Sequence, residues 1–209
     1  MLRVLTELMR MGRTKDSAIM TPPLLGDGEG RFKVQVIGNS GIALAAALGV
    51  PYVSLDRLYW EPGWKETPQK EFQAKIRAAL DQSDKGWVVD GNYDLKGGNM
   101  VSNEATDIVW LDPPLALYFP RIFFRTILRL FGLIPTCSPG CPETFREVFF
   151  SKKSILWWCL TNHWKLRKRE HARIALMGQK MKRFGGWGGD LRIWMEDVAD
   201  VCHAKPKGA

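Results

Sequence analysis

Short apolar runs alternate with Ala/Leu-rich or amphipathic stretches along most of this chain, and this pattern predicts an α/β fold. Runs rich in β-branched and aromatic residues predict strands at 33–37, 52–55, 86–90 and 107–112. Helical patterns follow at 42–48, 67–81, 115–131 and 143–160, and from 190 onward. Strands that alternate with helices favour a parallel sheet, which binds ligands at the carboxyl ends of its strands.

The first strand leads into a glycine turn, Gly38-Asn39-Ser40-Gly41, and a helix is predicted to begin at Ile42. Glycine and asparagine tolerate the backbone angles of a tight turn. A helix N-terminus offers free backbone N–H groups and the positive end of a dipole, so both favour an anion. The turn therefore has two interpretations. One is a phosphate site at these four residues, and the other is an ordinary strand-to-helix turn, which the residues on their own favour.

The phosphate-loop motif G-x-x-x-x-G-K-[ST] begins at this turn and then fails. Counted from Gly38, the second glycine position holds Ala43, the lysine position holds Leu44, and the Ser/Thr position holds Ala45. The segment thus lacks the ammonium group that reaches the β/γ phosphates and the hydroxyl that ligates Mg²⁺.

Acidic residues end or follow three successive predicted strands: Asp56, Asp90 and Asp112. A single aspartate in such a place is usually a turn or helix-cap residue. Three at the same edge of a parallel sheet, beside a glycine turn, favour a functional site.

Basic residues gather in the second half of the chain. Arg121, Arg125 and Arg129 recur every four residues in the predicted helix 115–131, so they form one stripe beside large apolar side chains. The stripe could clamp phosphates, form a solvated face, or lie on a membrane surface. A second cluster, 165–169, fits a lid over phosphates, a nucleic-acid patch or a solvated helix.

The bulk composition is that of a globular protein with a basic charge. The 209 residues carry a formal charge of +8 and a pI near 9.4, which favours an anionic ligand or partner: nucleotide, nucleic acid or membrane surface. The 12 prolines and 20 glycines include a Pro/Gly-rich stretch at 22–30, so we expect a flexible N-terminal extension over 1–31, a domain over 32–204 and a frayed tail over 205–209.

Four cysteines are present, Cys137, Cys141, Cys159 and Cys202. No second Cys/His pair with ligand spacing accompanies the first two, so we predict free thiols and no metal ligands. Nothing resembles a secretory signal or a membrane span, and a cytoplasmic location is expected. The N-terminal arginines offer a weak mitochondrial alternative, which nearby acidic residues oppose.

Several strings in the first half of the chain resemble one family. They are KVQVIGNSG at 33–41, LGVPYVSLD at 48–56, YWEPGW at 59–64, WVVDGNY at 87–93 and IVWLD at 108–112. Together they are similar to adenylate-kinase-like P-loop proteins, and most of all to the branch labelled topology modulation protein. The resemblance implies a three-layer P-loop NTPase fold with a parallel sheet and an α-helical lid over about 115–175. It also implies ATP, Mg²⁺ and phosphoryl transfer to a nucleotide or another small acceptor.

The resemblance also implies roles for particular residues. Gly38, Asn39, Ser40 and Gly41 match the start of the phosphate loop. Asp56, with Tyr59 and Trp60, matches the acceptor site. Asp90 matches an acid near Mg²⁺ or the acceptor, and Arg121 and Arg125 match arginines that neutralise the transferring phosphate.

The chain departs from the family directly after Gly41, where family members continue into x-G-K-[ST] and a longer helix. The gap corresponds to about two helical turns. Either an error in the gene model or in splicing dropped a short coding piece, or the variant is real and has lost nucleotide chemistry. In both cases we expect this chain to be a poor kinase. The rival hypotheses are a non-catalytic binding or scaffold protein and a basic nucleic-acid-binding protein.

Overall fold

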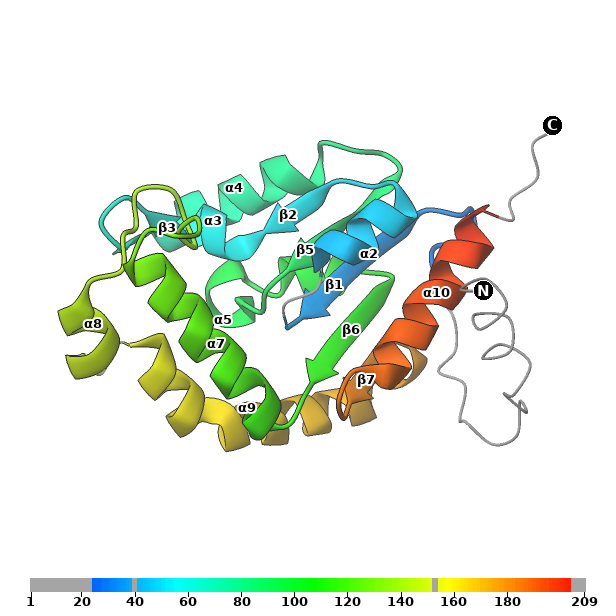
Figure 1. The fold of residues 1–209 in the computed structure, drawn as a ribbon. Coiled ribbons are helices and arrows are strands. Elements are labelled where there is room, and N and C mark those ends of the chain that lie inside the picture. The colour runs from blue at the N-terminus through cyan, green and yellow to red at the C-terminus, as the bar shows by residue number, and fades with distance from the viewer. Residues whose placement is uncertain (1–23, 39–40, 152–153, 204–209) are drawn as a thin grey trace, which may run out of the picture.

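The computed structural model describes residues 24–38, 41–151 and 154–203, and its centre is a five-stranded, wholly parallel sheet (Figure 1). The strand order across the sheet is β2–β5–β1–β6–β7. The strands are β1 (Phe32–Ile37), β2 (Tyr52–Ser54), β5 (Gly86–Asp90), β6 (Asp107–Asp112) and β7 (Met181–Gly185). The predicted α/β class with a parallel sheet is confirmed.

Helices cover both faces of this sheet, which gives three layers. On one face, α2 (Gly41–Leu48) and α10 (Gly189–His203) bury Leu44 and Trp194 against Val34 and Val36 of β1. The other face packs against α4 (Gln69–Leu80), α6 (Met100–Glu104) and the end of α9 (Ile155–Met177). Because both faces are covered, β5 is buried along its whole length.

The order of the crossovers places a topological switch point at β1. From β1 the chain passes to β2 at one edge and returns to β5 beside β1, and it then passes to β6 and β7 on the other side. Right-handed crossovers in opposite directions put the helix after β1 and the helices after β5 and β6 on opposite faces. The carboxyl ends of β1, β5 and β6 thus lie at the position where open parallel sheets bind ligands.

A long excursion joins β6 to β7 and consists of α7 (Leu115–Leu130), α8 (Phe145–Phe150) and α9. Figure 1 shows α8 at one end of the molecule, with α7 and the first half of α9 leading to it. We call residues 115–169 the helical arm. Glu170 is 1% exposed, and from this residue onward the buried face of α9 packs against the sheet.

Two segments differ from the sequence prediction. Residues 55–66, where the pattern predicted only the end of a strand, form a short helix, α3 (Leu55–Tyr59), and a two-stranded hairpin of β3 (Trp60–Glu61) and β4 (Lys65–Glu66). Strand β7 was not predicted because charged side chains interrupt its apolar pattern. The remaining short elements are α5 (Asp94–Gly97) and a 3₁₀ turn, η1 (Gly178–Lys180).

The helix predicted over 143–160 is divided into two helices at the polar residues 151–154. Helix α8 ends at Phe150, and the side chain of Ser154 caps α9 by accepting a hydrogen bond from Leu156 N at 3.2 Å. The same hydroxyl donates to Val148 O at 2.5 Å and so ties the two helices together. Helix α9 then continues through the second basic cluster to Met177, well beyond the predicted end.

Most of the predicted N-terminal extension, residues 1–23, and the predicted tail lie outside the described residues. The end of the extension is held by the sheet, because the N–H groups of Leu25 and Gly26 donate to the Asp107 carboxylate at 2.7 and 3.0 Å. Lys182 forms a fully buried ion pair with the same carboxylate at 2.8 Å. Within the described residues, no helix has the length and hydrophobicity needed to cross a bilayer.

Candidate functional site

The turn between β1 and α2 lies at the switch point. At each of its two described glycines, a side chain would collide with neighbouring residues. Gly38 has φ +145°, and an added Cβ would lie 2.7 Å from the Cβ of Leu111. Gly41 opens α2, where a Cβ would lie 3.0 Å from the Tyr52 ring and 3.2 Å from Asp90. Asn39 and Ser40, the middle of the predicted phosphate site, lie outside the described residues.

The carboxylate of Asp90, the last residue of β5, lies at the N-terminal end of α2. Its Oδ2 accepts hydrogen bonds from Gly41 N and from the Tyr52 hydroxyl, both at 3.3 Å. Burial raises the pKa of Asp90 to about 6, and the nearby Asp56 carboxylate adds to this, although the two hydrogen bonds act in the opposite direction. Burial and the Asp90 carboxylate in turn raise the pKa of Tyr52 to about 12.

The residues of this turn do not fit a Mg²⁺-bound triphosphate. The first N–H of α2 already donates to a carboxylate, which takes the place of an incoming anion. Leu44 and Ala45, which replace the lysine and hydroxyl of the motif, are 2% and 3% exposed and pack in the core. Among the described residues, no group of three or more His, Cys, Asp or Glu side chains could hold a metal ion.

Asp56 lies in the first turn of α3, two residues beyond β2. Its carboxylate accepts a hydrogen bond from the Tyr93 hydroxyl at 2.6 Å and a longer one from the Cys137 thiol at 3.8 Å. Burial, followed by the Asp56 charge, raises the pKa of both Tyr93 and Cys137. The side chain is therefore engaged by the loop after α7 and by the loop after β5.

Tyr59 and Trp60, the other predicted acceptor residues, belong to an aromatic cluster beside Asp56. The Tyr59 ring is 2% exposed and contacts Phe72 and Tyr93 with ring centroids 5.1 and 4.8 Å apart. Its hydroxyl donates to Glu66 Oε2 at 2.5 Å. Trp60 is half-buried. Tyr59 thus serves as core packing in this structure, whereas Trp60 retains exposed surface.

The third predicted aspartate, Asp112, is tied to two arginines from distant segments. Arg167 of α9 contacts its carboxylate at 2.9 Å, and Arg183 of β7 contacts it at 2.6 Å. The Asp112 side chain is only 3% exposed. Asp112 therefore links the helical arm and the last strand to the end of β6 through ion pairs. Asp90 and Asp56 lie together on the other side of β1.

The three arginines of α7 have different surroundings. Arg121 is exposed, whereas Arg125 is half-buried and its Nε has no hydrogen-bond partner among the described residues. Arg129 donates to Pro135 O at 3.1 Å and lies 3.5 Å from the Glu143 carboxylate. Of the stripe, the exposed Arg121 and the Nε of Arg125, which has no partner among the described residues, could face an anion.

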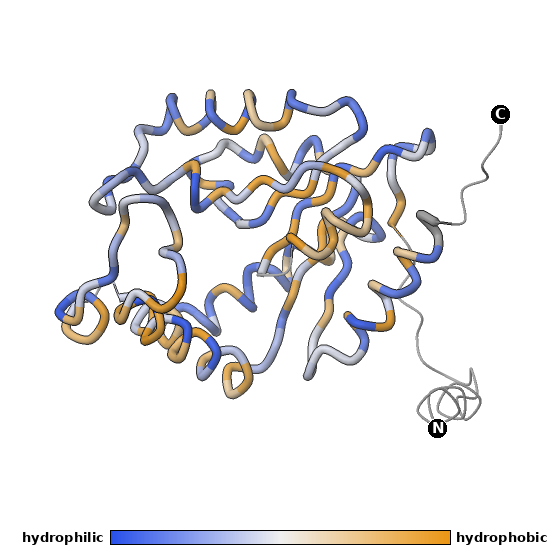
Figure 2. Tube along the Cα trace, turned by 45° about the horizontal axis from the view of Figure 1, so that its top comes forward, coloured by the Kyte–Doolittle hydropathy of each residue, from blue (hydrophilic) through white to orange (hydrophobic). Residues whose placement is uncertain are grey.

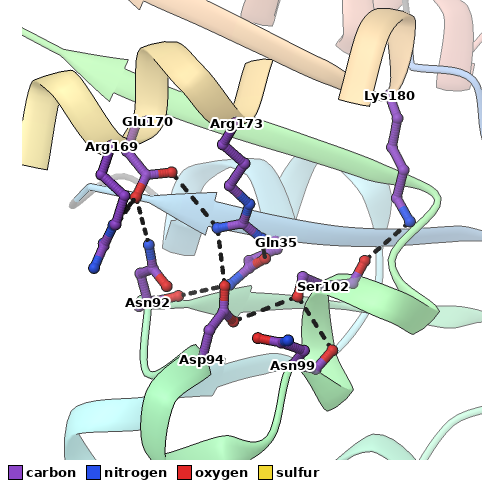
Figure 3. Close-up of polar contacts among 10 residues, drawn as sticks. Gln35, Asn92, Asp94, Asn99, Ser102, Arg169, Glu170, Arg173 and Lys180 are labelled. Atoms are coloured by element: carbon purple, nitrogen blue, oxygen red, sulfur yellow. Dashed lines mark hydrogen bonds and ion pairs between the residues drawn. The ribbon is translucent and has the colours of Figure 1, made fainter. Parts of the chain in front are cut away.

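A buried polar network beside the switch point was not predicted from the sequence (Figure 3). Arg173 contacts Asp94 at 3.0 Å and Glu170 at 3.5 Å, and Asn92 donates to Glu170 at 2.9 Å. The fully buried Gln35 joins it through Gly91 O and Arg173. The sequence contained one indication of this network. Glu170 and Arg173, which follow the basic cluster, have opposite charges, and an acid three residues before an arginine favours an ion pair on one helix face.

No protein-family model matches this chain, and no curated protein matches it either. The fold and the site therefore define the class alone: an α/β protein with a parallel five-stranded sheet, helices on both faces, and a glycine turn at its switch point.

Proposed function

We propose that this chain is a P-loop nucleotide or small-molecule kinase-like protein whose ATP-dependent phosphoryl transfer is impaired. The strand order supports this lineage. Numbered along the chain, the strands lie in the order 2-3-1-4-5, which differs from both the Rossmann order 3-2-1-4-5-6 and the flavodoxin order 2-1-3-4-5. A glycine turn after the central first strand is where a P-loop would lie.

The proposed impairment of catalysis rests on the structure at the N-terminal end of α2. Its first N–H donates to Asp90, and the lysine and hydroxyl positions of the motif hold the buried Leu44 and Ala45. The described part of the turn therefore supplies no lysine, and its Gly41 N–H is already engaged by a carboxylate. Loss of one donor to a developing charge typically costs about 3–4 kcal/mol of transition-state stabilisation. Losing the lysine together with the Mg²⁺ hydroxyl should therefore reduce turnover by several orders of magnitude.

The remaining predicted roles are part of the same proposal. Arg121 and Arg125 would lie toward a phosphate group, and Asp56 and Trp60 would border the acceptor. The acceptor class is a nucleotide or another small molecule with a hydroxyl or phosphate group.

The direct test measures ATP turnover by the purified chain with nucleoside monophosphates as acceptors. We expect rates far below the range of about 1–100 s⁻¹ that is typical of kinases. A turnover within that range would overturn the proposal. A companion variant carries a G-K-[ST] insert with the missing helical turns between Gly41 and Ile42, and recovery of turnover by this variant would support the kinase lineage.

Transcript sequencing across the codons for Asn39 to Ala45 separates the two origins of the gap. Reads that encode G-K-[ST] would mean that the native protein has a complete phosphate loop. Reads that join Gly41 directly to Ile42 would establish the loss as genuine, and a non-catalytic binding role would then replace catalysis.

A further inference from the structure

Exposed apolar side chains are concentrated on the helical arm. Of the eighteen large hydrophobic residues that are exposed in the described part of the chain, twelve lie within residues 115–169. The tube in Figure 2 shows hydrophobic positions interleaved with hydrophilic ones along this arm. Such a concentration on a soluble fold marks a surface for an interaction, since exposed apolar residues are otherwise scattered singly.

The net positive charge of the protein lies on the same segment. Residues 115–169 contain ten Lys/Arg and two Glu, which equals the +8 of the whole chain. Outside this segment, Lys/Arg and Asp/Glu are equal in number, at twenty each. The sequence of the arm therefore contains the excess of basic residues, and its described part also carries most of the exposed large hydrophobic side chains.

The helices of the arm present these side chains in stripes. On α7, Phe124 and Phe131 are 65% and 71% exposed and lie seven residues apart, so they share one face. On α9, Trp157 and Trp164 have the same spacing and are 52% and 68% exposed, with Lys168 one turn further. Both helices turn a buried face inward, at Thr126 on α7 and His163 on α9.

Helix α8 connects the aromatic surface with α7. Phe149 of α8 lies 6.5 Å from Phe123 of α7 and 4.8 Å from Phe145, measured between ring centroids. Phe150, 79% exposed, continues the series at 6.3 Å from Phe145. The rings thus form a continuous aromatic cluster at the end of the molecule, with the exposed Arg146 on the same short helix.

We infer that the helical arm docks on an anionic lipid surface, with its exposed aromatic side chains in the interface and its exposed basic residues, among them Arg121, Arg146, Lys165 and Lys168, toward the headgroups. Amphipathic helices that bind membranes peripherally combine Trp, Phe and Leu with a basic polar face, as this arm does. Each lysine or arginine close to an anionic leaflet contributes about 1 kcal/mol to the free energy of membrane binding. Tryptophan is suited to this position because its ring is apolar and its N–H is polar.

The charge distribution argues against a second copy of the chain as the occupant. In a two-fold symmetric interface the same patch meets itself, so the +8 segment of one copy would face the +8 segment of the other. Like charges across an interface oppose association. An anionic surface instead complements the positive charge of this segment.

The apolar residues argue against nucleic acid. Phosphates would pair with the basic side chains, and bases would stack on some of the rings. The arm also exposes aliphatic side chains, among them Leu128, Leu133, Ile155 and Leu160, which neither pair with phosphates nor stack on bases. Acyl chains at a bilayer surface accommodate both kinds of apolar side chain.

The test is co-sedimentation of the full chain with vesicles of phosphatidylcholine alone or mixed with phosphatidylserine. We expect binding to the anionic vesicles and at least about tenfold weaker binding to the neutral ones. In one variant, four exposed arm residues become serine, F124S/F131S/W157S/W164S. Its matched control is I42S/L95S/L176S/W187S, which removes four exposed hydrophobic residues elsewhere. The arm variant should lose binding to the anionic vesicles by about tenfold or more, and the control should retain it.

Three results would overturn the inference. One is equal vesicle binding by the arm variant and its control. Another is a concentration-dependent dimer in sedimentation velocity that the arm variant abolishes, since the occupant would then be a second copy. The third is binding of a single-stranded oligonucleotide that is tighter than vesicle binding and that the arm variant abolishes. Circular dichroism of each variant checks that its fold is intact.

Discussion

Asp90 is a buried carboxyl whose proton affinity is linked to folding. Its pKa is raised from 3.8 to about 6 chiefly by burial, so between these values the folded chain binds more protons than the unfolded chain. Stability must therefore fall as pH rises through this window, because stability rises with pH only where the unfolded state binds more protons. The effect is about 3 kcal/mol at most, at 1.36 kcal/mol per pKa unit.

We predict that Asp90→Asn removes this decline. Urea unfolding of the wild type and of D90N should be compared at pH 4 and pH 7, and D90N should gain stability relative to the wild type at pH 7 by roughly 1–3 kcal/mol. The exposed Asp197 on α10 provides the control, and D197N should leave the decline in place. An unchanged slope in D90N would show that Asp90 is ionised at little cost in the folded protein.

Asp112 is predicted to be a structural fastener. Asp112→Ala leaves Arg167 and Arg183 without their shared carboxylate, although both retain some access to water at 29% and 36% exposed. We expect a loss of about 2–4 kcal/mol in the free energy of unfolding, near the lower end for a broken buried pair. Asp112→Asn should fall between wild type and D112A because it preserves shape and one acceptor. A loss below about 1 kcal/mol in D112A would contradict this role.

At the residue scale, the position of a side chain could be inferred from the sequence only where chain connectivity determines it. Asp90 and Gly41 could be placed together because strand ends and the following helix starts share one edge of a parallel sheet. The hydrogen bond from Tyr52 to Asp90 could not be predicted, because it requires knowing that β2 pairs with β5. The same applies to Arg183 and Asp112, which meet only through the pairing of β7 with β6.

Among the elements, α2 depends on close packing at its first residue. Gly41→Ala would place a methyl group 3.0 Å from the Tyr52 ring and 3.2 Å from Asp90, closer than ordinary contact. We expect a loss of about 1–3 kcal/mol from overpacking. Gly189 opens α10 in the same way but has open space around it, so G189A should be neutral or slightly stabilising. Thermal unfolding followed by circular dichroism compares the two; equal melting temperatures would contradict the crowding.

The elements that the sequence pattern missed have physical causes. Strand β7 carries Lys182, whose buried charge is neutralised by Asp107 across the sheet, so a polar residue occupies a core position. Helix α3 follows β2 directly and is only five residues long, too short for a periodic signal. Helix α9 extends past its predicted end because the buried Glu170 and its partner Arg173 continue the inner face of the helix, a polar pairing that hydrophobic periodicity does not reveal.

At the scale of the whole molecule, the charge distribution is more informative than the total. A basic pI suggested an anionic partner but could not locate it. The segment with the excess charge is the helical arm, whose helix α8 lies at one end of the molecule (Figure 1). Its described residues include exposed aromatic side chains. The neutral remainder of the chain contains the switch point with Asp56 and Asp90, whereas Arg121 and Arg125 of the candidate site lie on the arm.

This asymmetry predicts different consequences for equal changes in net charge. The variants R146Q/K165Q/K168Q and K65Q/K70Q/K85Q each lower the formal charge from +8 to +5, and all six side chains are exposed and outside the ion pairs of the described residues. The local field depends on how charges are arranged as well as on their sum. We therefore expect the arm variant to elute from a cation exchanger at clearly lower salt than the control variant. Because surface charges further apart than about 8–10 Å are largely screened at physiological salt, the difference should be largest in dilute buffer. Co-elution of the two variants at low salt would mean that the arm does not dominate the contact with an anionic surface.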